Sequence, residues 1–163
     1  MNVRTIRLAL FAGSFLVSAT AAQAQTIAAD LKPAIDSPRV HAGQAVKARL
    51  TVHLPQNLVV PSDKPGSRFM VATLLTIEAP AGVTVSGITY PRSHQTLLAG
   101  QKKPTLAIGP DFTILVQFRL APTAAGNLSV PARLRYQACN ASTCYPPATV
   151  STQWTLHLAG GHD

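Results

Sequence analysis

The sequence has 163 residues, of which 47% are hydrophobic and 12% are charged, and its 14 Lys and Arg against 6 Asp and Glu give a formal net charge of +8. The basic residues are scattered and no aromatic residues interleave with them, which argues against a nucleic-acid platform. Six acidic residues give no support to a hydrolase built on a carboxylate pair, and neither a glycine-rich phosphate loop nor a Gly-x-Ser-x-Gly elbow occurs.

The N-terminus carries the pattern of an export signal. Residues 1–7 are basic and contain no acid, residues 8–19 form an apolar run, and small residues lead up to Ala24. This order is typical of a signal peptide cleaved after Ala24, and a run of about a dozen residues falls short of the roughly 20 that span a bilayer. We therefore expect a signal peptide at 1–24 and one periplasmic domain at 25–163 without a membrane span. The mature part keeps a formal charge of +6, which allows weak attraction to acidic partners or anionic lipid head groups.

Alternation of apolar and polar residues is the dominant pattern of the mature part. In residues 46–54 every even position is apolar and every odd position is polar, which is typical of a half-buried strand. Further runs rich in β-branched and aromatic residues predict five more strands, at residues 70–78, 83–90, 112–120, 128–138 and 150–158. No segment has a sustained helical period.

Prolines and glycines separate these runs. The 13 prolines and 10 glycines stand mostly between the predicted strands, where they favour turns. Six or seven short strands in one domain predict an all-β fold, an immunoglobulin-like antiparallel β-sandwich. Trp154 is in phase with the apolar residues of the last strand and is predicted to lie in the core. The longest stretch without strand character, residues 91–111, is predicted to be a functional or mobile connection.

Cys139 and Cys144 are the two cysteines of the chain, and in an oxidising compartment such a pair is expected to close. Cys139 is in phase with Arg135 and Gln137, which predicts a position on the polar face of its strand. A hairpin turn between the cysteines would set them opposite each other, about 4.5 to 5.5 Å apart at Cα, within reach of a disulfide.

Two interpretations of the pair stay open on spacing alone. A bridge that closes so short a loop stabilises by only about 2 kcal/mol, and a position at a hairpin end favours exchange with another thiol. The alternative is an immunoglobulin-like binding or structural module in which the disulfide is inert.

The segment YQACNASTCYPP at residues 136–147 closely resembles the cysteine hairpin of the N-terminal periplasmic domain of the thiol-disulfide interchange protein DsbD. The segments APAGVTV at 79–85 and Tyr90-Pro91 are also similar to that family, and the resemblance covers residues 58–158. It implies an immunoglobulin-like domain whose two cysteines, the catalytic pair, alternate between dithiol and disulfide as part of a protein-disulfide reductase, with no cofactor.

The resemblance also implies partners. In that family the domain receives electrons from a membrane-embedded donor and passes them to thioredoxin-like periplasmic proteins, including disulfide isomerases and cytochrome c maturation factors. The resemblance extends to one domain of the multidomain reductase, so we expect this chain to act as a monomer with a separate electron donor. The candidate binding residues flank the cysteines or lie in the connection described next: Tyr136, Gln137, Tyr145, Pro146, Leu97 and Leu98.

The family has a cap loop that covers the cysteines with an aromatic side chain, and the resemblance puts the corresponding loop in residues 91–111. That span contains no Phe, Tyr or Trp. Either Leu97 and Leu98 shield the pair instead, or the shielding is weak and the stretch is only a surface connection.

The five histidines are far apart in sequence and never at a metal-ligand spacing. His53 and His157 fall on the polar phase of predicted strands, so we expect surface histidines. A soft-metal site of Cys139, Cys144 and His94 has little support, because the mature part contains a single methionine. No metal site is therefore predicted.

Overall fold

The computed structural model describes residues 26–37 and 39–159. The predicted signal peptide at 1–24 lies outside the described residues, and no helix within them is long and apolar enough to cross a membrane. The described residues form ten strands, which are β1 (Asp30–Ile35), β2 (Ala45–His53), β3 (Val60–Pro61), β4 (Leu74–Ile77), β5 (Val83–Thr89), β6 (His94–Thr96), β7 (Thr105–Ile108), β8 (Asp111–Leu120), β9 (Asn127–Tyr136) and β10 (Ala148–His157).

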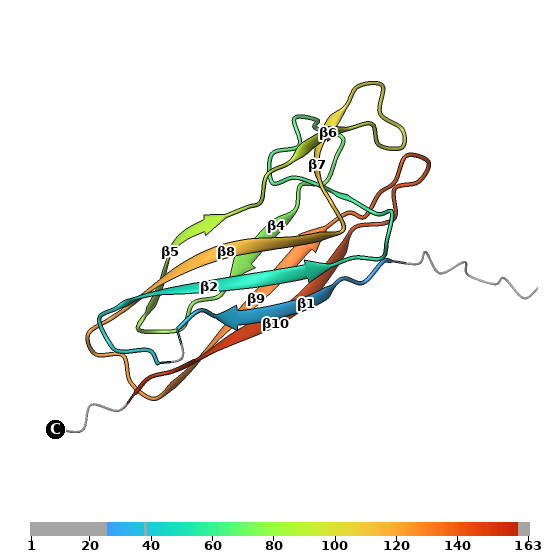
Figure 1. Cartoon of the computed structure of the whole chain (residues 1–163). Helices are drawn as coiled ribbons and strands as arrows, with labels where there is room; N and C mark the ends of the chain where they lie inside the picture. The colour runs from blue at the N-terminus through green and yellow to red at the C-terminus, as the bar shows by residue number, and fades with distance from the viewer. Residues whose placement is uncertain (1–25, 38, 160–163) are drawn as a thin grey trace, which may run out of the picture.

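Two antiparallel sheets pack against each other. One has the strand order β1-β2-β8-β5 and the other the order β10-β9-β4. A third, small sheet with the order β3-β7-β6 stands at the end of the sandwich where the loop between β9 and β10 also lies (Figure 1). The prediction of an all-β, immunoglobulin-like β-sandwich is confirmed.

The core follows from the alternation seen in the sequence. Along β2 the side chains of Val46, Ala48, Leu50 and Val52 are buried, and the polar residues between them are exposed or only partly buried, because successive residues of a strand point to opposite faces. Phe118 of β8 and Trp154 of β10 meet edge to face across the two sheets, with ring centroids 5.5 Å apart, and the Trp154 indole Nε1 donates to the Arg49 carbonyl 3.1 Å away. The prediction that Trp154 belongs to the core is confirmed, since it is 1% exposed.

All six predicted strands exist, with ends that differ by a few residues. The prediction that residues 91–111 lack strands is wrong, because β6 and β7 lie within them. β6 has three residues and β7 has four, too few for a visible alternation. Most of β7 is buried, so its side chains are apolar or small on both faces and give no period of two.

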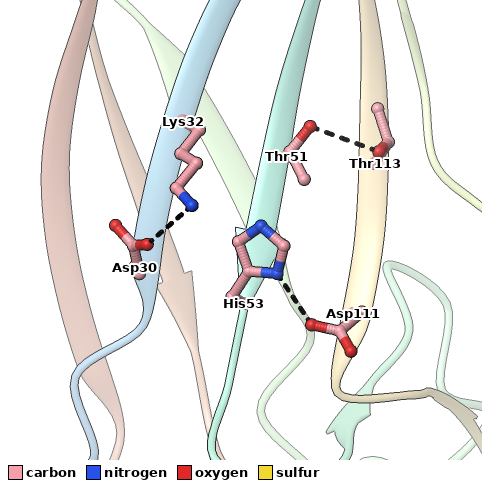
Figure 2. A network of polar contacts seen from close by, with 6 residues as sticks. All are labelled: Asp30, Lys32, Thr51, His53, Asp111 and Thr113. Atoms are coloured by element: carbon pink, nitrogen blue, oxygen red, sulfur yellow. Dashed lines mark hydrogen bonds and ion pairs between the residues drawn. The ribbon is translucent and has the colours of Figure 1, made fainter.

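The outer face of the four-stranded sheet carries polar side chains that pair with one another, both between strands and within β1 (Figure 2). His53 of β2 lies 2.8 Å from the Asp111 carboxylate of β8, and Lys32 pairs with Asp30 on β1. His53 is thus on the polar face of its strand, as predicted, and its ring is paired with a carboxylate.

Candidate functional site

Cys139 and Cys144 form a disulfide. The two residues oppose each other as an isolated antiparallel bridge, with their Cα atoms 4.1 Å apart. The hairpin predicted from the spacing is therefore confirmed. It lies between the last residue of β9 and the first residue of β10, at the end of the sandwich that carries the small sheet.

The turn between the cysteines is built by Asn140. Its backbone N–H donates to the Thr143 carbonyl at 2.8 Å, and its side-chain Oδ1 accepts from the backbone N–H groups of Ser142 at 2.9 Å and Thr143 at 2.7 Å. Tyr145 N–H donates to the Ala138 carbonyl at 2.9 Å, on the other side of the disulfide. Asparagine favours such turns because its side chain satisfies nearby backbone donors.

The disulfide lies outside the main core. Ala138 packs in the core between the sheets, whereas Cys139 belongs to a separate apolar cluster with Leu98 and Ala107. The strand phase predicted for Cys139 is therefore correct, since it points away from the main core. Cys139 is nevertheless 0% exposed, because segments distant in sequence cover this face beyond the end of β9.

Two of these segments are hydrogen-bonded to the hairpin. Val59, next to β3, donates to the Cys139 carbonyl at 2.9 Å and accepts from the Cys139 N–H at 2.8 Å. On the other side, Ala99 N–H donates to the Asn140 carbonyl at 3.1 Å, and the Ala99 carbonyl oxygen lies 3.9 Å from Cys144 Sγ. We call residues 97–101, which include Ala99, the cap.

The two leucines of the cap differ sharply. Leu98 is 1% exposed and packs in the cysteine cluster, while Leu97 is 57% exposed. Cys144 is only partly buried, in contrast to Cys139. Leu98 of the cap therefore packs with the fully buried Cys139, whereas Cys144, whose Sγ lies 3.9 Å from the Ala99 carbonyl oxygen, stays partly exposed.

The remaining candidate binding residues have different surroundings. Gln137 braces the hairpin, because its Nε2 donates to the Tyr145 carbonyl at 3.1 Å. Tyr145 is partly buried against the main core and Pro146 is exposed. Tyr136 is 1% exposed, so it is placed in the core and not on a surface that a partner could touch.

Tyr136 anchors the segment that precedes β1. Its hydroxyl donates to the Ile27 carbonyl and accepts from the Ala29 N–H, both at 2.6 Å. Burial raises the pKa of Tyr136 above its ordinary value of 10.0, and the hydrogen bond from Ala29 opposes that shift. The pKa of Tyr90, whose hydroxyl accepts from the Leu75 N–H at 2.8 Å, is raised by burial as well.

Across residues 26–37 and 39–159, no three His, Cys, Asp or Glu side chains are grouped so that they could hold a metal ion. The two sulfurs are joined to each other. The chemistry that this arrangement offers is exchange of the S–S bond with an incoming thiolate.

Comparison with known proteins gives distant structural likenesses. No protein family model and no curated protein matches the sequence. Among solved structures, the chain is similar to the GAE domain of GGA2p from Saccharomyces cerevisiae, with a TM-score of 0.46 and 10% identity over 82% of this chain and 98% of that one. It is also similar to the N-terminal domain of DsbD from Neisseria meningitidis in the reduced form, with a TM-score of 0.46 and 13% identity over 79% and 90% of the two chains.

A third structure is the N-terminal periplasmic domain of ScsB from Proteus mirabilis, with a TM-score of 0.45 and 18% identity over 80% of this chain and 45% of that one. Likenesses at this level concern the architecture alone. They do not assign a chemistry to Cys139 and Cys144.

Three residues of the cysteine cluster were absent from the sequence-based candidates: Val59, Met70 and Ala107. Val59 stands in the apolar run Leu58-Val59-Val60 before Pro61, a pattern that favours a short buried strand at a turn. No pattern in the sequence connects Met70 or Ala107 to the cysteines, because the contact depends on how the small sheet folds over the hairpin.

Proposed function

We propose that this protein is a periplasmic thiol-disulfide exchange domain, in which Cys139 and Cys144 carry two electrons to or from thioredoxin-like partners. The observation that carries the proposal is the position of the disulfide. It joins residues only five apart in sequence, lies outside the main core and has one partly exposed cysteine. A bridge in this position contributes little to holding two sheets together, since the closed loop is short.

The exposure of the two cysteines favours an order of events. A partner thiolate attacks Sγ of Cys144, a new intermolecular S–S bond forms, and Cys139 leaves as a thiolate that then takes up a proton. The partner's second thiol, as a thiolate, then attacks the partner sulfur that is bonded to Cys144. This step releases Cys144 as a thiolate, which is protonated in turn. The partner is oxidised to a disulfide and this domain is reduced to a dithiol by two electrons. Donation to an oxidised partner is the reverse sequence, with Cys144 attacking and Cys139 resolving.

The resemblance at residues 136–147 supports partners of the thioredoxin type and a membrane-embedded electron donor, which would make the domain part of a protein-disulfide reductase that serves disulfide isomerases or cytochrome c maturation. The alternative is a binding or structural module with an inert bridge. Gln137, Tyr145 and Pro146 flank the cysteines in sequence, and together with the cap they are the partner-contacting residues of this proposal.

The reduction potential distinguishes the two functions. The mature protein is equilibrated with glutathione or dithiothreitol buffers, and the fraction of dithiol is measured by alkylation and mass spectrometry. An exchanging disulfide should have a potential well above about −300 mV, whereas structural disulfides lie below that value. A potential below it would refute the proposed exchange.

A further inference from the structure

A cleft opens between residues 66–69 and residues 100–105, so that the last two residues of the cap form part of its lining. Its volume is about 780 Å³. The two walls are tied together, since the Ser67 hydroxyl donates to Gln101 Oε1 at 3.1 Å and the Leu106 N–H donates to the Pro65 carbonyl at 3.3 Å. These two hydrogen bonds hold the walls of the hollow next to each other.

Three cations line this cleft, Arg68 on one wall and Lys102 and Lys103 on the other, and no carboxylate lines it. None of the three takes part in an ion pair with the described residues. Like charges gathered in a concave site with low-dielectric walls focus a positive potential that attracts acidic groups.

The same cleft offers an apolar contact. Phe69 lines it and is 74% exposed, and the Arg68 guanidinium carbon lies 5.0 Å from the centre of its ring. A cation over an aromatic ring orients both groups. An exposed aromatic next to unpaired cations matches a partner segment that carries both carboxylates and an apolar side chain.

Each wall of the cleft is adjacent in sequence to a residue that lies near the disulfide. Phe69 is followed by Met70, which packs against the cysteine cluster. On the other wall, Gly100 is preceded by Ala99, whose carbonyl oxygen lies 3.9 Å from Cys144 Sγ. A chain segment held in the cleft would therefore sit next to the cap.

We propose that this cleft is a docking site for an acidic, partly apolar surface segment of the protein with which Cys144 exchanges its disulfide. The inference rests on the proposed function and adds the chemical character of the partner. Arg68, Lys102 and Lys103 bind its carboxylates and Phe69 packs against its apolar side chain. A concave site can accept a protruding chain segment, whereas a bilayer surface presents no segment that could enter it.

A binding experiment on the oxidised mature protein tests the cleft independently of redox activity. The probe is a short fluorescent peptide rich in glutamate with one central leucine, and its Kd is measured by anisotropy. The variant R68E/K102E/K103E should weaken binding by at least about tenfold. The matched control R39E/K47E/R119E makes the same change of net charge with exposed side chains near the opposite end of the sandwich, and should change Kd by less than about twofold. Phe69→Ser should weaken binding with little change in its salt dependence.

Salt dependence gives a second readout. Wild-type affinity should fall as ionic strength rises from 0.1 to 1 M, where the Debye length shrinks from about 10 Å to about 3 Å. Absence of binding at 0.1 M, or equal weakening in both triple variants, would overturn the proposal. Binding of anionic phosphatidylglycerol vesicles in place of the peptide, lost in the cleft variant alone, would overturn it in favour of a membrane surface.

The link to exchange is tested by two reductants. Dithiothreitol attacks as a small thiolate that makes no docking contact, so at 1 M salt, where charges are screened, it should reduce wild type and both triple variants at similar rates. A reduced thioredoxin with an acidic surface should react at least about tenfold more slowly with R68E/K102E/K103E than with the control. An unchanged thioredoxin rate would show that the cleft does not serve exchange, whereas a disulfide that no thiol reduces would refute the proposed function and leave the peptide result as it stands.

Discussion

Val59 and Cys139 exchange both of their backbone hydrogen bonds, at 2.9 and 2.8 Å. Cys139 is thereby held by a neighbouring strand segment as well as by the disulfide, and its side chain is fully buried. Cys144 has no such second partner among the described backbone contacts and is partly exposed. The two cysteines are therefore unequal, although the hairpin sets them opposite each other.

This inequality predicts which sulfur a partner reaches first. In Cys139→Ala the remaining Cys144 thiol should be alkylated by iodoacetamide at least about tenfold faster than the remaining Cys139 thiol in Cys144→Ala, because thiol reactions depend on access. Cys139→Ala should also trap a mixed disulfide with a thioredoxin-like partner. Circular dichroism of both variants checks that the sandwich is intact, and equal alkylation rates in two folded variants would contradict the assignment.

The cap predicts a difference between its two leucines. Leu98→Ser should speed reduction of the disulfide by dithiothreitol several-fold, because Leu98 is buried against Cys139 and a polar side chain there weakens the closed cap. Leu97→Ser is the matched control, since Leu97 is exposed, and it should leave the rate unchanged. Urea unfolding should show that Leu98→Ser lowers the free energy of unfolding by about 2–5 kcal/mol. If both variants are reduced like the wild type, the cap does not gate access.

The sequence predicted those strands whose alternation extends over several residues. β2, β8 and β9 have nine or ten residues each, and in each one apolar face is buried, so the period of two is visible. β1 was missed because Pro33 interrupts it, and a proline is tolerated there since β1 is an edge strand that pairs only with β2.

The candidate site was predictable only in part, because some of its contacts join residues that are close in sequence and others join residues that are far apart. Cys139 and Cys144 lie opposite each other because of a local turn, and residue types such as Asn140 and Ser142 favour a turn there. The burial of Cys139 depends on Val59, Met70 and Leu98, which reach it through the folding of the small sheet. The alternation of residues within one strand does not show which distant residues bury a side chain at its end.

Tyr136 predicts a loss of stability at alkaline pH. Its folded-state pKa is raised above 10.0, mainly by burial, so folding favours the protonated phenol. The stabilisation is fully present below about pH 10 and is lost as pH rises through the folded-state pKa. Urea unfolding between neutral and strongly alkaline pH should show a constant free energy of unfolding followed by a decline, to which Tyr90 also contributes because its pKa is raised.

Tyr136→Phe tests the hydroxyl itself at neutral pH. It leaves the Ile27 carbonyl and the Ala29 N–H without their hydrogen bonds to this hydroxyl, and we expect a loss of about 1–3 kcal/mol in the free energy of unfolding. Tyr145→Phe removes a hydroxyl that makes no hydrogen bond with the described residues, and should change stability by less than about 0.5 kcal/mol. The alkaline decline should be smaller in Tyr136→Phe than in the wild type, and an identical decline would assign the effect to other groups.

Replacing Asn140 should shift the reduction potential of the disulfide. Its side chain accepts hydrogen bonds from Ser142 and Thr143 only while the turn is closed, and the disulfide keeps the turn closed in the oxidised protein. After reduction the hairpin can relax, so Asn140→Ala should destabilise the oxidised form more than the reduced form, by up to about 1 kcal/mol. Because 30 mV corresponds to about 1.4 kcal/mol for two electrons, the potential should rise by up to about 20 mV.

Asn127→Ala is the matched control for this shift, since it removes a similar side chain from β9 at its other end, where Asn127 Oδ1 lies 2.9 Å from His157 Nδ1. Its potential should equal that of the wild type in the same glutathione buffers. If Asn140→Ala leaves the potential unchanged while it lowers the stability of both redox forms equally, then the turn stays closed after reduction. The dithiol would in that case be held in the geometry of the disulfide, and Cys144 would attack an oxidised partner from a preformed hairpin.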